Sequence, residues 1–239
     1  MAKRIAALAA LLLSCASART GDMATVEILG FSADGDVFAF EEFGIQDGSG
    51  FPYANRYYID TDDDTFLPGT PIRIRLEDEQ ATVDAARQQT KSQAATIISD
   101  EELKQNQGLV AGWNPVTELS AEPHRIVVNP RPVVPPLDSP LEIRLEELSL
   151  EQPADCRDIG DVMGFRLLCV ATAPGAETRL VHEDTTVPAS RGCALGYRIA
   201  GVQTFYPEGA EPVFAVLIAV RRFGFEGPDH RFLAVTGKL

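Results

Sequence analysis

The sequence is poor in the residues that most often bind metals or carry enzyme chemistry. Its 239 residues include three histidines, four cysteines and one tryptophan. No two histidines are spaced as H-x-x-x-H, and no two cysteines as C-x-x-C, the spacings typical of metal sites. A G-x-S-x-G elbow, a P-loop and a dinucleotide fingerprint are also missing. These absences argue against the catalytic classes that short motifs identify.

Basic residues are scarce as well. The chain has 21 lysines and arginines against 35 acidic residues, which gives a formal net charge of −14. Because a nucleic-acid binder needs a basic surface for the phosphates, this composition predicts no nucleic-acid partner. The excess negative charge favours solubility through self-repulsion.

No apolar run reaches the roughly 20 residues of a membrane-spanning helix, so no transmembrane span is expected. The run Ile5–Leu13 follows two basic residues and precedes small residues, which is the layout of a secretory signal. We therefore expect residues 1–18 to be a signal peptide and the protein to be secreted or periplasmic. Two processing routes stay open: cleavage after Ala18, or acylation of Cys15 as a lipid anchor.

Three cysteines remain after removal of such a signal. An odd number in an oxidising compartment predicts one disulfide and one free thiol. Cys169 lies in the apolar stretch "FRLLCVA", where we expect it to be buried and reduced. Cys156 and Cys193 lie in polar, turn-like segments, where a bridge is sterically easier. We therefore predict a Cys156–Cys193 disulfide.

Alternation of apolar and polar residues indicates strands along most of the remaining chain. "VFAVLIAV" is apolar throughout and should be a central strand covered on both faces. In "LEIRLEELSL" the aliphatic phase changes, which predicts a β-bulge at Glu146 and Glu147. The fold is expected to be mainly β, a sandwich or paired antiparallel sheets. "FSADGDVFAF" also resembles a strand pair of a propeller blade, which implies propeller-blade-like strand units.

Residues 79–106 interrupt the β pattern, because their apolar residues recur every three or four positions, as in a helix. Ser99 and Glu102 form a capping box that should begin a second short helix. This region is therefore predicted to be a helical insertion. The apolar and small residues of its stripe are Val83, Ala86, Thr90, Ala94 and Ile97.

Prolines concentrate in "NPRPVVPPLDSP", residues 129–140, which excludes a helix or a central strand there. We interpret this segment as a linker between an N-terminal β unit, residues 19–128, and a C-terminal β unit, residues 141–239. The pattern leaves open whether the two units form one domain or two.

An aromatic stretch, "GFPYANRYY", is a candidate recognition surface for a sugar or peptide, because tyrosine combines an apolar face with a polar tip. The same side chains could instead pack a hairpin against the core. The candidate binding residues of this loop are Phe51, Tyr53, Asn55 and Tyr57.

The acidic stretch "DTDDDT" places Asp60, Asp62 and Asp64 at alternating positions, as in a calcium loop. Thr65 and Pro71 stand where such a loop has its glycine and its bidentate acid. A solvated turn in which aspartates bind backbone groups is therefore the first interpretation, and calcium is the alternative. No other cofactor is expected.

Three longer segments carry a resemblance that covers most of the chain after the signal: "GFSADGDVFAFEEFGIQDGSGFPYAN", "SRGCALGYRI" and "FEGPDHRFLAV". They resemble segments of a bacterial family of predicted secreted proteins whose function has not been assigned. The resemblance implies export, and Cys156 and Cys193 match positions of that family, whereas Cys169 is peculiar to this chain. It implies no activity.

The export signal, the aromatic loop and the missing catalytic motifs favour an envelope protein that is not an enzyme. It would bind an envelope protein or a small ligand through loops at one end of a β scaffold. The alternative is a periplasmic hydrolase that acts on cell-wall or carbohydrate substrates with paired carboxylates. Two facing acids in a deep cleft would favour the hydrolase, and an aromatic patch would favour binding.

Overall fold

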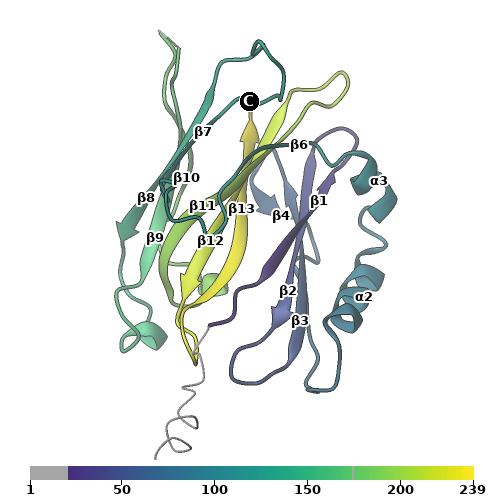
Figure 1. Ribbon diagram of the computed structural model, residues 1–239, viewed down its shortest axis with the longest axis vertical. Coiled ribbons are helices and arrows are strands. Elements are labelled where there is room, and N and C mark those ends of the chain that lie inside the picture. Colours follow the sequence, from purple (N-terminus) through teal and green to yellow (C-terminus); the bar gives the residue numbers. More distant parts are fainter. Residues whose placement is uncertain (1–20, 174) are drawn as a thin grey trace, which may run out of the picture.

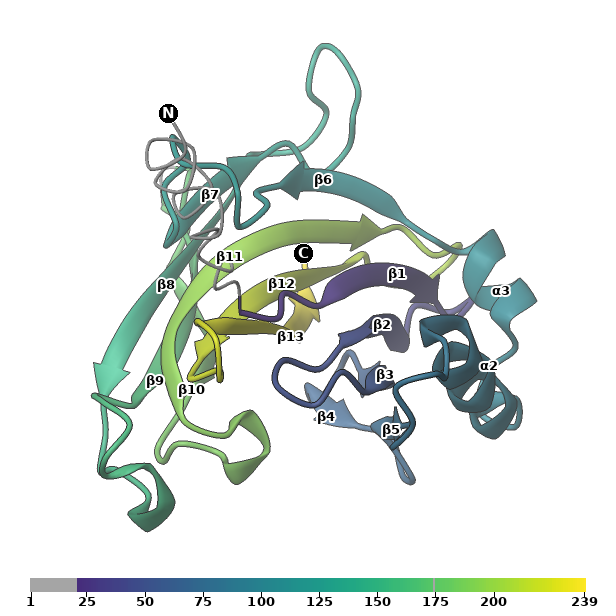
Figure 2. The same cartoon turned by 60° about the horizontal axis from the view of Figure 1, so that its bottom comes forward.

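The computed structural model describes residues 21–173 and 175–239, which form three antiparallel sheets and two α-helices. The predicted signal, residues 1–18 with Cys15, lies outside these residues. Figures 1 and 2 show the elements stacked in layers: the helices, an N-terminal sheet, a central sheet and an outer sheet. The fold is mainly β with a helical insertion, as predicted, and propeller-like strand units are not confirmed.

Each layer is defined by its strand order. The N-terminal sheet has the order β1-β2-β3-β4 with β5 beside β3, the central sheet β13-β12-β11-β6, and the outer sheet β10-β9-β8-β7. The bounds are β1 Thr25–Phe31, β2 Val37–Ile45, β3 Pro52–Asp60, β4 Thr65–Phe66, β5 Ile72–Arg75, α2 Val83–Ala94, α3 Asp100–Gln105, β6 Leu109–Trp113, β7 Arg125–Val128, β8 Leu141–Ser149, β9 Met163–Val170, β10 Arg179–Glu183, β11 Ala194–Phe205, β12 Val213–Arg222 and β13 Asp229–Lys238. Two 3-10 turns, η1 Ala154–Cys156 and η2 Ala189–Arg191, lie among the described residues.

Strand β12 is the centre of the core. All its residues from Val213 to Val220 are buried. Phe214 and its alternating neighbours pack against the outer sheet, and Leu217 and its neighbours pack against the N-terminal sheet. Successive side chains of a strand point to opposite faces, so a strand that is apolar at every position needs a layer on each side. The prediction of a doubly covered central strand is confirmed.

The helices cover the outer face of the N-terminal sheet. Ala94 of α2 and Leu103 of α3 are buried against Tyr58 of β3. The hydroxyl of Ser99 accepts a hydrogen bond from the Glu102 N–H, as predicted for the start of the second helix.

The chain crosses between layers before the proline-rich segment. β6 pairs with β11 in the central sheet, and β7 pairs with β8 in the outer sheet. Residues 129–140 therefore connect two adjacent strands of one sheet, where we expected a linker between two β units. Sequence pattern missed this because a strand's apolar face does not show which sheet it joins.

The predicted β-bulge in β8 is wrong. β8 and β9 pair without a register shift from Glu142 opposite Val170 to Ser149 opposite Met163. The strand keeps a strict period of two, and Leu148 lies on its less buried face. No helix among the described residues combines the length and apolar character needed to cross a membrane.

The predicted disulfide joins Cys156 of η1 to Cys193, which lies two residues after the end of the η2 turn. Cys169 is free and partly buried at the edge of the core between the central and outer sheets. The pairing of Ala194 of β11 with Arg222 of β12 places Cys193 beside the end of β12, and the bridge ties this point to η1.

Reduction of this disulfide should destabilise the protein strongly. The bridge spans a sequence separation of 37 residues, for which chain entropy gives about 4 kcal/mol in the free energy of unfolding. Urea unfolding with and without reductant measures this loss. Cys169→Ala is the control and should retain both the bridge and its stabilisation. An unchanged stability after reduction would contradict the prediction.

Candidate functional site

Two clefts of similar volume lie on opposite faces of the N-terminal sheet. The helix cleft, about 610 Å³, lies between that sheet and the helices. The edge cleft, about 670 Å³, lies beside β13, the edge strand of the central sheet. The adjacent residues Glu41 and Glu42 of β2 divide between them, because successive side chains alternate faces.

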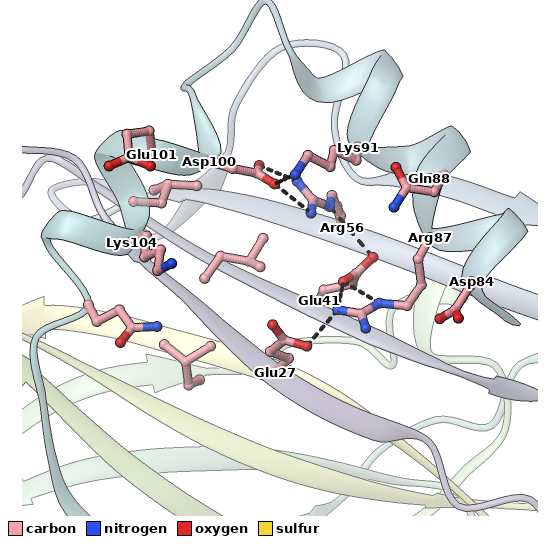
Figure 3. A pocket seen from close by; sticks show the side chains of 14 residues that line it. Glu27, Glu41, Arg56, Asp84, Arg87, Gln88, Lys91, Asp100, Glu101 and Lys104 are labelled. Atoms are coloured by element: carbon pink, nitrogen blue, oxygen red, sulfur yellow. Dashed lines mark hydrogen bonds and ion pairs between the residues drawn. The ribbon is translucent and has the colours of Figure 1, made fainter.

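The helix cleft is lined by charged side chains, several of which form ion pairs (Figure 3). Arg56 is 4% exposed and makes two hydrogen bonds to Asp100, of 2.7 and 3.3 Å. Glu41 is fully buried, accepts two hydrogen bonds from Arg87, and has its Oε1 3.5 Å from the Arg56 Nε. Burial disfavours ionised Asp100, but its hydrogen bonds with Arg56 and Lys91 outweigh burial and hold its pKa below the usual value. This network fastens α2 and α3 to the sheet.

The edge cleft has predominantly apolar walls and contributions from all three sheets. β13 lies between β10 of the outer sheet and the strands of the N-terminal sheet (Figure 2). The walls include Tyr57, Phe66, Val220, Leu233 and Val235. Such a volume and polarity are usual for a small-molecule site.

Two carboxylates bind the free edge of β13. Glu42 accepts a 2.7 Å hydrogen bond from the Phe232 N–H, and Asp64 accepts a 2.8 Å hydrogen bond from the Thr236 N–H. Outward N–H groups occur at every second residue of an antiparallel edge strand. The N–H of Ala234, between these two, therefore points to the same side, where Ala234 lines the cleft.

Glu42 is also held by side chains of β3. It is 2% exposed and accepts hydrogen bonds from the Tyr57 hydroxyl, at 2.7 Å, and from the Asn55 amide, at 3.0 Å. Burial, and secondarily the charge of Glu42, raises the pKa of Tyr57 far above its ordinary value, so Tyr57 remains a donor.

Arg222 is a partly buried cation of the edge cleft, and the described residues provide no partner for it. Within the described part of the chain, its guanidinium makes no hydrogen bond and no ion pair, although the residue is partly buried. Burial, with the charge of Arg231 as a smaller cause, lowers its pKa. The guanidinium lies against Gly192, where an added Cβ would come within 2.8 Å of Nη2 and where φ is +63°. The "SRGC" turn thus leaves room for Arg222.

Two other cations of the edge cleft have carboxylate partners, and a third, Arg73, is exposed to solvent. Arg231 contacts Asp22 at 2.6 Å and lies over the ring of Tyr53. Arg191 of η2 pairs with Asp184, which also receives a 3.1 Å contact from His182.

His182 connects the outer sheet to the N-terminal sheet past the edge of β13. Its Nε2 contacts Asp184, and its Nδ1 lies 3.6 Å from Asp64. Burial favours the neutral imidazole, but hydrogen bonds with Asp184 and Asp64 outweigh it and raise the pKa of His182 to about 9. At neutral pH the ring is charged and forms an ion pair with both carboxylates.

The residues of the predicted aromatic loop belong to β3, except Phe51. Tyr53 is buried in the core, with its hydroxyl 3.4 Å from Asp22, so it presents no surface to a ligand. Asn55 and Tyr57 line the edge cleft. Tyr53, Asn55 and Tyr57 share one face of β3, because they lie two residues apart, and both tyrosines of this face are buried in the core.

The three predicted calcium ligands bind other groups. Asp60 accepts hydrogen bonds from the N–H groups of Asp62 and Asp63, Asp62 pairs with Lys238, and Asp64 binds Thr236. Across the residues with described positions, no group of three or more His, Cys, Asp or Glu side chains is arranged to hold a metal ion. Calcium binding at this turn stays an untested alternative to the solvated turn.

Arg222 and Glu42 are site residues that sequence reasoning did not single out. Arg222 follows the apolar strand directly, and a charge at the end of a buried strand was the available signal. Glu42 is one of many acidic residues. Its neighbour Glu41 has the same residue type in the same strand, although it lies in the other cleft, so the sequence does not distinguish the two.

Removal of the buried guanidinium in the helix cleft should be costly. Arg56→Met leaves Glu41 and Asp100 without this partner, and we expect a loss of about 3–5 kcal/mol in the free energy of unfolding. Arg75→Met removes an ion pair whose side chains are 51% and 68% exposed, and should cost about 1 kcal/mol or less. Urea unfolding compares them, and equal losses would contradict a buried network.

His182 should make stability depend on alkaline pH. Its pKa in the folded protein, about 9, lies above its ordinary 6.5. The stabilisation is therefore complete below pH 6.5 and is lost as the pH rises through about 9. We expect the melting temperature to fall over this range in the wild type, and to fall less in His182→Gln. Parallel curves for the two proteins would contradict the assignment.

Comparison with known proteins gives one match. The model of the family described as "Predicted secreted protein (DUF2259)" matches residues 39–238. No curated protein and no solved structure matches the chain. The matched span contains most of β2 and all later strands, and therefore every lining residue of the edge cleft, whereas the helix cleft also uses Glu27, Ile28 and Leu29 of β1. Its description confirms the predicted secretion and assigns no activity. The chain belongs to this family of predicted secreted proteins.

Proposed function

We propose that this protein is an exported, non-catalytic binding protein whose ligand is a small molecule that occupies the edge cleft. The observation that carries the proposal is a cleft of about 670 Å³ with mainly apolar walls and one partly buried guanidinium, Arg222, for which the described residues provide no partner. Sites for small ligands combine apolar walls with a few placed polar groups in this way.

The carboxylates of the edge cleft support binding over hydrolysis. A glycosidase needs one carboxyl group that donates a proton and another that acts as base or nucleophile. Glu42 accepts three hydrogen bonds, and Asp64 binds Thr236 and His182. Both side chains therefore stabilise the edge of β13 and are committed to contacts within the fold.

The η2 turn borders the edge cleft. Ser190 is exposed and lines the cleft, whereas its neighbour Ala189 is equally exposed and does not line it. A bulky side chain at position 190 can therefore obstruct the cleft without disturbing the core, and the same side chain at position 189 is a matched control.

Obstruction of the edge cleft should abolish ligand binding. We expect wild type and Ala189→Trp, incubated with a small-molecule and lipid extract of the producing cells, to retain a bound mass in native mass spectrometry. Ser190→Trp should lose most of that bound mass because Ser190 lines the cleft and the indole would take up part of its volume.

Two results would overturn the proposal: a bound mass that Ser190→Trp retains in full, or no bound mass on the wild type. A bound mass that is converted with time into smaller fragments, and is not converted by Glu42→Gln, would instead establish the hydrolase alternative. Urea unfolding of each variant checks that the fold is intact.

A further inference from the structure

The polar groups of the edge cleft differ in whether the protein itself provides them with hydrogen-bond or ion-pair partners. Glu42 and Asp64 are satisfied by donors of the protein, and Arg231 and Arg191 have carboxylate partners. Arg222 has neither a hydrogen bond nor an ion pair among the described residues. The guanidinium nitrogens of Arg222 are not among the buried polar atoms that lack a partner, so they still reach water. They are therefore available to form charge-assisted hydrogen bonds with an anionic ligand.

The fold prepares the position of Arg222. The end of β12 pairs with the start of β11, so the backbone of Arg222 is fixed opposite Ala194. Gly192 leaves space for the guanidinium, and the adjacent Cys193 is tied to Cys156. A prearranged guanidinium binds a planar carboxylate or a phosphate with two hydrogen bonds.

The remainder of the cleft suits an apolar body. Tyr57 stacks on Phe40 with ring centres 4.5 Å apart, which leaves its other side toward Phe66. Val220, Leu233 and Val235 continue the apolar wall along β12 and β13. Ala234 lies between Leu233 and Val235, and its outward N–H can donate to one further oxygen of a ligand.

We propose that the edge cleft binds an amphiphile with one anionic head group, a carboxylate or a phosphate, which pairs with Arg222 while the apolar body lies along Tyr57 and Leu233. This inference rests on the proposed function and adds the chemical class of the ligand. One anionic head group is expected because Arg222 has no partner among the described residues, whereas His182, Arg191 and Arg231 of the same cleft already pair with carboxylates.

Calorimetric titration with matched probes tests the inference. The probes are decanoate, decyl phosphate, decyl glucoside and inorganic phosphate, each below its micellar concentration. We expect at least one of the two anionic decyl probes to bind more tightly than the neutral glucoside, and inorganic phosphate to bind weakly because it has no apolar body. The preferred anionic probe distinguishes a carboxylate source from a phosphate source.

Arg222→Gln should weaken the anionic decyl probes by about tenfold to a hundredfold, the usual effect of losing a charged hydrogen bond, and leave decyl glucoside within about twofold. Arg221→Gln is the matched control, because Arg221 is the adjacent residue of β12, is exposed, and donates to Leu195 outside the cleft. It should leave the affinity for every probe unchanged.

The inference is overturned if Arg222→Gln binds the anionic probes like the wild type, if decyl glucoside binds as tightly as decanoate, or if no decyl probe binds. These results are separable from failure of the proposed function. Binding that Ser190→Trp abolishes but Arg222→Gln leaves intact would retain the edge cleft as a binding site and reject the anionic ligand. Binding that neither variant changes would reject both.

Discussion

Burial of β12 on both faces is the constraint from which the layer order follows. Every side chain from Val213 to Val220 is apolar and buried, and these side chains alternate between two faces. The strand can remove both faces from water only if one sheet packs on each side. The central sheet therefore lies between the N-terminal and outer sheets, and the helices then cover the second face of the N-terminal sheet.

The edge cleft is a consequence of this layering. The central sheet ends at β13, and the sheets on either side are joined past that edge by the contact of Asp64 with His182. An edge strand in a partly buried position must have its outward N–H groups satisfied. Glu42 and Asp64 satisfy two of them, so the polar character of the cleft arises from the needs of the edge. Arg222 is different in kind, because the described residues leave it unsatisfied.

The pair Glu41 and Glu42 shows how one sequence feature gives two roles. The period of two sends Glu41 to the helix cleft, where Arg56 and Arg87 bind it, and Glu42 to the edge cleft, where it binds β13. Both carboxylates are almost completely buried. Each tolerates burial because donors surround it, so neither signals catalysis through its burial alone.

The sequence by itself determined the features that depend on local pattern. The apolar run of β12 predicted a doubly covered strand, the three-to-four period predicted the helices, and polar turns around Cys156 and Cys193 predicted the disulfide. Only the tertiary structure decided which strands share a sheet. β6 and β7 precede the proline-rich segment, yet they pair with β11 and β8, which follow it. The tertiary structure also decided the candidate site, because Glu42, His182 and Arg222 are far apart in sequence and meet through the packing of three sheets. Local periodicity records which face of a strand is buried and carries no record of the layer that covers it.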